Sequence, residues 1–533
     1  MTYIKSLSSS KHQYLWVMLL ALVVASMLYY NSLNVFQVGV YMDDASYVAL
    51  ARSLVEKGVY GYTNVPGELH LTRYPFGFPL LLVPVAKLFS ENLTALQLTS
   101  LAITLINGWL LYRFGSYFGW GDHSILRLSI PILYLFSPLI SGHAIMVMSE
   151  AAFTLWVLLT LFLLSLILNS DNLSIIYSIL LSSVVFAAAT TRTLGYPLII
   201  IVLIFLGVAK KYRQMIVFGL GFLAIFAIAW IVLPVNLQDF GLSVEYGRQL
   251  REARHYEQVF EGNALLIRIL SLLWLYLTEG VHSVVVSIGG VGSTSRAVLG
   301  EWGLDFITTI IGLFTSGLIA IGMMRTWRSY PIPFVYTVIY CGSLLIWPFY
   351  LPRFLYPVLP FLCYYLLCGI EYIMGAFLPA MLQITDKRRD RILYVSVSII
   401  SLILLVASVF RSLPRDTSLN HTIDLEEGIN WIKSNTASDV VIMSENTLTA
   451  FIYADRSVVG YPSDLENLLN KIEYYGVDYL LIRPRLQWST PRYLEFSNIA
   501  QGILTYVQTE PDIFTLVYSN PAEKTYVYRV TPP

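Results

Sequence analysis

Charged residues are scarce in this 533-residue chain: 13% of the residues are Asp, Glu, Lys or Arg, whereas 56% are hydrophobic. Soluble domains carry about 25% charged residues. The scarcity therefore excludes an ordinary soluble protein and predicts a chain that crosses a membrane several times. The formal net charge is zero. Because nucleic-acid-binding proteins carry a basic excess, the charge balance gives no support to nucleic acid as a partner.

Cysteine and the common catalytic motifs are also lacking. The three cysteines, Cys341, Cys363 and Cys368, lie in apolar stretches, which excludes a disulfide framework and a C-x-x-C metal site. No P-loop, H-E-x-x-H or G-x-S-x-G motif occurs in the structural context that its chemistry needs. The sequence therefore predicts no cofactor and no metal site.

Apolar stretches of membrane-spanning length are what the chain does have. A spanning helix needs about 20 predominantly apolar residues. The stretch after Lys5 and Lys11 has no clear small-residue cleavage site behind it, so we expect a retained first span rather than a removed signal peptide. Eleven spans are expected, at 14–31, 94–112, 124–142, 148–169, 173–190, 194–209, 214–234, 303–324, 331–350, 354–376 and 391–411.

Three clusters of basic residues orient these spans: Lys210-Lys211-Tyr212-Arg213, Arg325-Thr326-Trp327-Arg328 and Lys387-Arg388-Arg389-Asp390-Arg391. Cytoplasmic loops are enriched in Lys and Arg. We therefore place the three clusters and the N-terminus in the cytoplasm of a cell whose plasma membrane holds the protein. Counting spans outward then puts the remaining loops on the outer side, at 32–93, 143–147, 235–302, 351–353 and 412–533.

Two further apolar stretches are not counted as spans. Residues 75–90 are short and rich in proline, and a span there would move the first basic cluster to the outer side. We therefore expect a re-entrant or interfacial helix. Residues 264–290 are interrupted by Glu279, Gly280 and His282, and we interpret them as interfacial helices within a large external loop.

After residue 411 the composition becomes that of a soluble domain. Strands that alternate with helical patterns predict a small α/β domain. We expect helices at 424–435 and 463–475, and strands at 439–444, 477–482, 513–518 and 524–529. The fold class expected for the whole chain is thus a polytopic α-helical membrane domain, residues 1–411, followed by an extracytoplasmic α/β domain, residues 412–533.

An acidic pair, Asp43-Asp44, directly follows the first span and begins an amphipathic stretch. Asp is a favoured helix N-cap and suits the first helical turn, so the pair has a purely structural interpretation. A carboxylate beside a second carboxylate and a low-dielectric surface can also have a raised pKa. Such a group is a candidate general base for an acceptor hydroxyl or amine.

Three arginines, Arg73, Arg192 and Arg353, are expected on the same outer side, where the positive-inside rule disfavours them. Each has a structural interpretation as an interfacial side chain. A guanidinium fork also suits a phosphate group, so an anionic ligand on that side would account for all three. Glu150 opens a span near the outer surface and is functional by default if it faces inward. His70 is more simply a solvated side chain.

These residues, in this order, resemble the membrane-embedded GT-C glycosyltransferases, and above all the protein O-mannosyltransferase and aminoarabinose (lipid A) transferase group. Members of this group carry an acidic pair in the first external loop and a basic residue before a proline-rich helix. The likeness covers almost the whole chain, including the C-terminal α/β domain that such proteins often have. The matching stretches are Asp43-Asp44-Ala45-Ser46-Tyr47, Ala51-Arg52-Ser53-Leu54, Gly58, Arg73-Tyr74-Pro75-Phe76, Ser149-Glu150, Arg192, and Arg353 with Pro357 and Pro360.

The resemblance implies that the enzyme takes a sugar from a polyprenyl-phosphate donor and passes it, with inversion, to a protein, lipid or polysaccharide acceptor on the outer face. It implies that Asp43 is the general base and that Asp44 orients Asp43 or the acceptor. It also implies that Arg73, Arg353 and Arg192 hold the donor phosphate. The candidate substrate-binding residues are Tyr47, His70 and Glu150.

One departure concerns the second carboxylate, because Asp44 stands where the two best-known subgroups have Glu. The shorter side chain leaves the acceptor class open. It also leaves open any metal, which related mannosyltransferases do without and oligosaccharyltransferases use; we expect none. The alternative function is a transporter or flippase of lipid-linked sugars. That function predicts charged residues near mid-membrane and discontinuous spans in two related halves of the chain. A non-catalytic scaffold or sensor is the third hypothesis.

Overall fold

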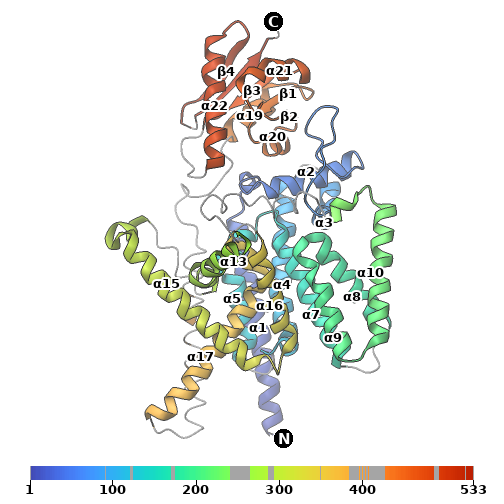
Figure 1. Ribbon diagram of the computed structural model, residues 1–533, viewed down its shortest axis with the longest axis vertical. Coiled ribbons are helices and arrows are strands. Elements are labelled where there is room, and N and C mark those ends of the chain that lie inside the picture. The colour runs from blue at the N-terminus through green and yellow to red at the C-terminus, as the bar shows by residue number, and fades with distance from the viewer. Residues whose placement is uncertain are drawn as a thin grey trace.

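The computed structural model describes nearly all of the helical part and most of the C-terminal part of the chain (Figure 1). The described residues are 2–89, 92–120, 124–169, 175–240, 264–285, 293–347, 350–382, 395, 399, 402, 403, 406, 426–484, 491–522 and 524–531. The expected span at 391–411, the basic cluster at 387–391 and the boundary near residue 411 fall almost wholly outside them.

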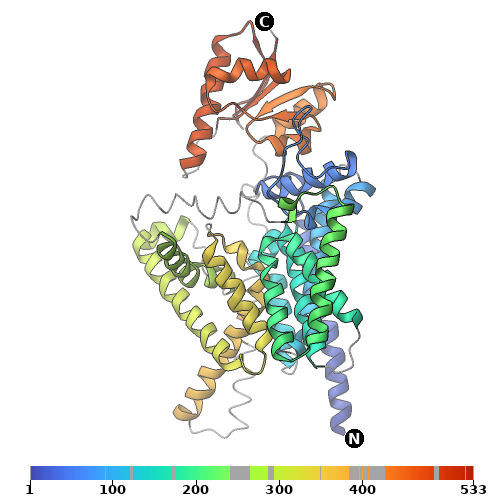
Figure 2. The same cartoon turned by 45° about the vertical axis from the view of Figure 1, so that its right-hand side comes forward.

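The first part of the chain folds into a bundle of helices that run roughly side by side (Figure 2). Most of these helices are apolar on all sides, as expected for segments that face lipid or one another. Their bounds are α1 (Thr2–Asn31), α4 (Leu93–Phe118), α5 (Ser124–Phe136), α7 (Ser149–Asn169), α8 (Ile175–Thr191), α9 (Pro197–Val208), α10 (Tyr212–Val232), α13 (Ala264–Leu275), α15 (Ser293–Thr326), α16 (Pro331–Ile346) and α17 (Leu359–Leu382).

Seven helical segments among the described residues are long and apolar enough to cross a membrane, so the chain is a multi-pass membrane protein. Six of them correspond to expected spans. Four other expected spans form helices of 11 to 17 residues in that search. Proline shortens one of them, because Pro138 begins a separate helix, α6 (Pro138–His143), directly after α5. The seven segments are Gln13–Asn31, Leu93–Phe118, Ser149–Asn169, Tyr212–Val232, Leu265–Val285, Phe306–Thr326 and Pro352–Ala376.

The seventh segment corrects the expectation for residues 264–290, since we had interpreted them as separate interfacial helices. In the structure α13 continues through a π-helical turn, Tyr276–Gly280, into α14 (Val281–Val285), without a break. The π turn accommodates Glu279 and Gly280 inside one continuous helix. Close packing against α15 holds this turn, because a side chain at Gly312 would overlap the backbone of Thr278.

Two shorter helices lie at one end of the bundle, α2 (Asp43–Glu56) and α3 (Gly77–Leu88) (Figure 1). The twelve residues of α3 reach about 18 Å, which is less than the roughly 30 Å of a hydrocarbon core. Its length therefore agrees with the expected re-entrant or interfacial helix. The two helices pack against each other along their lengths, and α3 also packs against α4 and α8.

The C-terminal part contains a five-stranded mixed sheet in the order β2-β1-β3-β5-β4. Strands β2, β1 and β3 are parallel, whereas β5 pairs antiparallel with β3 and β4. Helices cover the sheet, as the alternating pattern of the sequence predicted. The elements are α19 (Glu426–Asn435), β1 (Val441–Ser444), α20 (Thr447–Ala454), β2 (Ser457–Val459), α21 (Leu468–Tyr475), β3 (Tyr479–Ile482), α22 (Pro491–Thr509), β4 (Phe514–Asn520) and β5 (Thr525–Val530).

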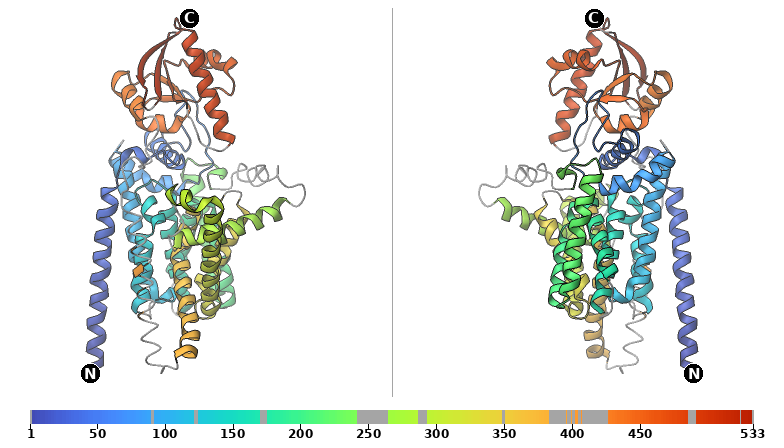
Figure 3. Two further views of the ribbon diagram at one scale, coloured as in Figure 1. Left: turned by 90° about the vertical axis from the view of Figure 1, so that its left-hand side faces the viewer. Right: turned by 90° about the vertical axis from the view of Figure 1, so that its right-hand side faces the viewer.

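The C-terminal sheet domain sits over α2, at the end of the bundle opposite the N-terminus (Figure 3). Helix α20 packs directly on α2. The Tyr453 hydroxyl of α20 donates to the carbonyls of Val35 and Val38, just before α2. The link between α9 and α10, which carries the first basic cluster, lies at the end where the N-terminus lies (Figure 1). The sheet domain and α2 therefore occupy one end of the molecule and the basic link the other.

Candidate active site

The acidic pair opens α2 after a strained turn. Met42, directly before the pair, has a φ of 61°, a conformation that costs free energy for a residue with a side chain. Asp43 and Asp44 follow as the first two residues of the helix, where successive side chains are about 100° apart. The turn thus sends the two carboxylates to different surroundings.

Asp44 is fully buried and serves the backbone of this turn. One carboxylate oxygen accepts from the Gly39 N–H at 2.7 Å and the other from the Ala45 N–H at 3.0 Å. Burial raises the pKa of Asp44 to about 7, and the nearby Asp43 charge adds to the rise, although the backbone hydrogen bonds oppose it. These contacts hold the loop in place before α2.

Asp43 instead faces two side chains from distant parts of the chain. One oxygen lies 2.5 Å from an amino nitrogen of Arg353, and the other accepts a hydrogen bond from the Tyr74 hydroxyl at 2.5 Å. Its side chain is 21% exposed. Asp43 is thus the member of the pair that a ligand can reach.

A second carboxylate, Glu150, links two of the predicted arginines. It is 1% exposed and lies 2.7 Å from Arg192 and 3.9 Å from Arg353. Arg192 also donates to the Ser149 hydroxyl at 3.1 Å, which is 3.0 Å from the Tyr47 hydroxyl. Tyr47 therefore supports the position of Arg192.

We refer to Asp43, Glu150, Arg192 and Arg353 as the charge cluster. Two carboxylates and two guanidinium groups balance in charge, which is how ionised groups persist away from water. Each residue lies at the end of a helical element: α2, α7, α8 and the 3₁₀ helix Pro352–Val358. The fold thereby brings four helix ends, and the charged side chains that they carry, to one place.

His143 borders the charge cluster, although the sequence analysis did not select it. Its Nδ1 lies 2.8 Å from the Leu139 carbonyl, and its buried Nε2 has no hydrogen-bond partner among the described residues. Burial lowers the pKa of His143, while Glu150 opposes that effect. The ring of Tyr41 packs beside His143, 5.6 Å between centroids. The one available signal was position: His143 opens a short loop expected on the outer side.

Four predicted site residues are not members of the charge cluster: Asp44 and Tyr47, described above, and Arg73 and His70. Arg73 is exposed and packs over the Tyr74 ring, 5.4 Å from its centroid, so it reaches the cluster through Tyr74. His70 pairs with Glu68 at 2.9 Å on the loop between α2 and α3. Tyr74, which the motif contained but the site prediction did not, contacts Asp43 directly, as Arg353 does.

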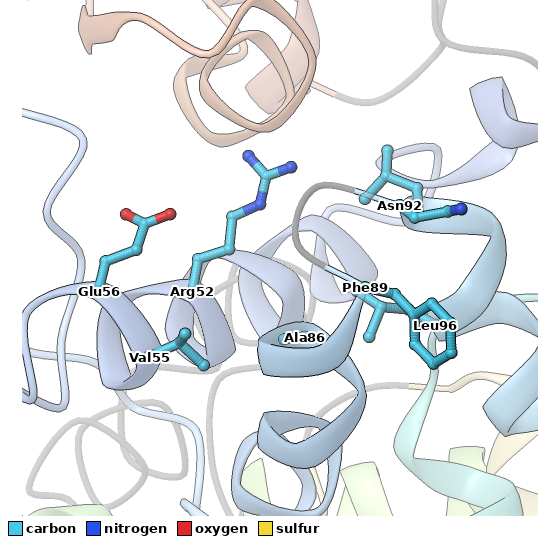
Figure 4. Close-up of a pocket in the computed structure, with 8 residues that line it drawn as sticks. Arg52, Val55, Glu56, Ala86, Phe89, Asn92 and Leu96 are labelled. Atoms are coloured by element: carbon cyan, nitrogen blue, oxygen red, sulfur yellow. The ribbon is translucent and has the colours of Figure 1, made fainter.

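Within the described residues, no group of three or more His, Cys, Asp or Glu side chains could hold a metal ion. A pocket of about 50 Å³ lies between α2, α3 and α4 and is lined by Arg52, Glu56 and Asn92, among others (Figure 4). Arg52 is nine residues after Asp43, which puts the two on opposite faces of α2. That pocket is therefore separate from the charge cluster.

No protein-family model matches the sequence. Over 100 aligned residues the chain is 32% identical to a UPF0344 protein of Lactiplantibacillus plantarum, a match that takes in 15% of this chain and 84% of that protein. The likeness is confined to one segment of this chain, and the name of the matched protein states no activity.

Solved structures match nearly the whole chain. ArnT from Cupriavidus metallidurans bound to undecaprenyl phosphate has a TM-score of 0.57 at 12% identity and covers 96% of this chain and 98% of that one. The archaeal oligosaccharyltransferase AglB from Archaeoglobus fulgidus, in complex with an inhibitory peptide and a dolichol-phosphate, has a TM-score of 0.52 at 11% identity, with coverages of 96% and 74%. The chain therefore has a GT-C-like fold across nearly its whole length.

Proposed function

We propose that this protein is a membrane glycosyltransferase that moves a sugar from a polyprenyl-phosphate donor to an acceptor, with inversion. The reaction would take place at the end of the bundle beneath the C-terminal sheet domain, which we place outside the cell. Two similar folds support the donor class, because ArnT was solved with undecaprenyl phosphate and AglB with a dolichol-phosphate.

The observation that carries the proposal is the contact between Asp43 and Arg353. The partly exposed Asp43 carboxylate lies 2.5 Å from the Arg353 guanidinium group, on the more exposed side of the charge cluster. A base for the acceptor and a cation for the leaving phosphate must lie on either side of the anomeric carbon. The pair supplies both groups, and the donor sugar would separate them when it binds between them.

The proposed reaction has one group-transfer step. The acceptor oxygen forms a bond to the anomeric carbon, while the bond from that carbon to the phosphate oxygen breaks. The acceptor proton passes to the Asp43 carboxylate, and the electron pair of the broken bond leaves with the polyprenyl phosphate. Because the leaving phosphate gains negative charge, guanidinium groups fixed nearby stabilise the transition state more than the ground state.

Arg353 and Arg192 are the groups that we assign to the phosphate. Glu150 keeps both guanidinium groups in place before the donor binds, so little reorganisation is needed during the reaction. The phosphate and Asp43 compete for Arg353. Donor binding therefore draws the guanidinium group toward the phosphate and frees an Asp43 oxygen to accept a proton.

Replacement of Asp43 by Asn tests this function, because Asn keeps the shape of the side chain but cannot accept a proton. We expect Asp43→Asn to keep donor binding and to lower transfer by about 100- to 10,000-fold, the range of general base catalysis. The assay follows binding and turnover of a polyprenyl-phosphate sugar by purified protein. Glu56→Gln, at the exposed far end of the same helix, is the matched control and should transfer at the wild-type rate.

Unimpaired transfer by Asp43→Asn would remove the base assignment. A wild-type protein that carries the intact donor across vesicle membranes without cleaving it would favour a transporter of lipid-linked sugars. A protein that neither binds nor cleaves the donor would favour the hypothesis of a non-catalytic scaffold or sensor.

A further inference from the structure

A second concave site lies where the loop between α2 and α3 meets the C-terminal sheet domain. The open cavity there has a volume of about 360 Å³, within the range of about 300 to 1,000 Å³ typical of small-molecule sites. Tyr62, Asn64 and His70 line it from the loop, and Lys471 and Tyr475 line it from α21. We refer to it as the junction cavity.

The two walls of the junction cavity are joined to each other. The Val458 N–H donates to the Asn64 carbonyl at 2.7 Å, and the Asn64 side-chain amide donates to the Val458 carbonyl at 2.8 Å. The loop is itself a short hairpin, with paired backbone hydrogen bonds between Tyr62 and His70. The cavity is therefore built before a ligand arrives, which lowers the free-energy cost of binding.

The charges around the junction cavity already balance. Glu68 lies 2.9 Å from His70 and accepts a hydrogen bond from the Tyr475 hydroxyl at 3.1 Å. The same carboxylate faces Lys471, the cavity's ammonium group. Among the described residues, the lining contains no arginine, whose guanidinium fork suits a phosphate group. The described lining thus favours a neutral ligand.

The remaining lining suits a polyhydroxylated ligand. Tyr62 and Tyr475 offer aromatic rings against which the apolar face of a sugar ring can pack. Thr447 and Asn64 add short polar side chains that can both donate and accept hydrogen bonds. A lipid tail would instead require a wall without these polar groups.

A chain of hydrogen bonds leads from the junction cavity to the charge cluster. The Thr72 hydroxyl donates to the Tyr62 hydroxyl at 3.2 Å and accepts from the Tyr74 N–H at 3.1 Å. Tyr74 then donates to Asp43. A ligand that fills the cavity is thus linked to the base through three hydrogen-bonded residues.

We propose that the junction cavity binds sugar rings of a neutral glycan, and that the acceptor of the transferase is this glycan. The assignment of the glycan as acceptor rests on the proposed function. Sugar rings remote from the accepting hydroxyl occupy the cavity, while the terminal ring reaches toward Asp43. Remote binding of this kind positions the reacting hydroxyl.

Direct binding of oligosaccharides to the purified full-length protein tests the proposal. The probes are maltotriose, mannotriose and N-acetylchitotriose. Saturation-transfer NMR and titration calorimetry measure their binding. We expect at least one probe to bind at millimolar concentration or below, and Tyr475→Ala to weaken its binding about tenfold, or about 1.4 kcal/mol. Tyr474→Ala is the matched control, because Tyr474 is the neighbouring residue on α21, is 77% exposed and lies outside the lining.

The outcomes separate this proposal from the transferase itself. Asp43→Asn should bind the oligosaccharide as the wild type does, because the base lies outside the cavity. Equal losses in Tyr474→Ala and Tyr475→Ala, or no binding of any probe, would overturn the glycan site. Transfer to a peptide or lipid acceptor without glycan binding would overturn it and leave the transferase standing. Glycan binding without transfer to any acceptor would keep the glycan site and remove the transferase.

Discussion

The charge cluster and the junction cavity use similar side chains in opposite surroundings. In the charge cluster Glu150 is 1% exposed and sits between two guanidinium groups. Beside the junction cavity, Glu68 pairs with the lining residue His70, and their side chains are 34% and 49% exposed. Electrostatic interactions are several-fold stronger away from water. The first region therefore suits chemistry in which charge moves, and the second suits recognition of a neutral ligand.

The difference also teaches where stability resides. A buried carboxylate between two arginines cannot be removed without leaving cations that have lost their partner. An exposed carboxylate can be removed, because water takes over its contacts. A glutamate thus contributes very differently to the free energy of unfolding in the two regions. Three further predictions test this contrast.

The largest effect should come from Glu150→Gln, which keeps the size of the side chain and removes its charge. We expect the free energy of unfolding to fall by about 3 to 5 kcal/mol, because Arg192 and Arg353 then lie buried without that countercharge. Thermal denaturation in detergent, followed by circular dichroism, measures the loss. Glu68→Gln is the matched change in the junction cavity and should cost about 0 to 1 kcal/mol. Equal losses in the two variants would break the comparison.

An intermediate effect is expected for donor binding. Arg353→Ala should weaken the affinity for a polyprenyl phosphate about 30-fold, or about 2 kcal/mol, because a charge-assisted hydrogen bond to the phosphate is lost. Arg73→Ala, which removes an exposed arginine at the rim, should change it by about fivefold or less. Thermophoresis with a fluorescent polyprenyl phosphate compares the two variants. An unchanged affinity in Arg353→Ala would contradict its phosphate role.

The last prediction concerns the pH dependence that comes from Asp44, which is buried without an arginine. Its pKa is raised to about 7 from 3.8, so the folded protein holds this proton more tightly than the unfolded chain. The stabilisation is complete below about pH 4 and is lost as the pH rises to about 7, by at most about 1.4 kcal/mol per pH unit. Asp44→Asn does not titrate. Relative to the wild type, the melting temperature of Asp44→Asn should therefore rise as the pH increases through that range. A difference in melting temperature that does not change with pH would contradict the burial effect.

Much of the architecture could be predicted from the sequence, because its signals are local. Apolar length predicted six of the seven candidate spans, and alternation predicted four of the five strands of the C-terminal sheet. The missed strand, Ser457–Val459, has three residues, too few to show a period. The continuous helix at 265–285 was missed because a π turn absorbs residues that ordinarily end a helix.

The candidate site could be predicted only in part, because its contacts are long-range. Asp43, Arg192 and Arg353 could be found, since charges stand out at the ends of apolar spans. Asp43 and Arg353 are 310 positions apart, however, and no spacing indicates that they touch. The burial of Asp44 and the location of His70 beside the sheet domain depend on how the loop folds against α20 and α21, which no motif contains.

The hydrogen bonds between Asn64 and Val458 have a consequence for the order of synthesis. They join residues 394 positions apart, and a ribosome makes the loop long before it makes strand β2. A chain interrupted before β2 would already hold every residue of the charge cluster but not the strand that secures the neighbouring loop. Synthesis of the C-terminal sheet domain therefore secures the loop between α2 and α3, which a chain interrupted before β2 would leave without these hydrogen bonds.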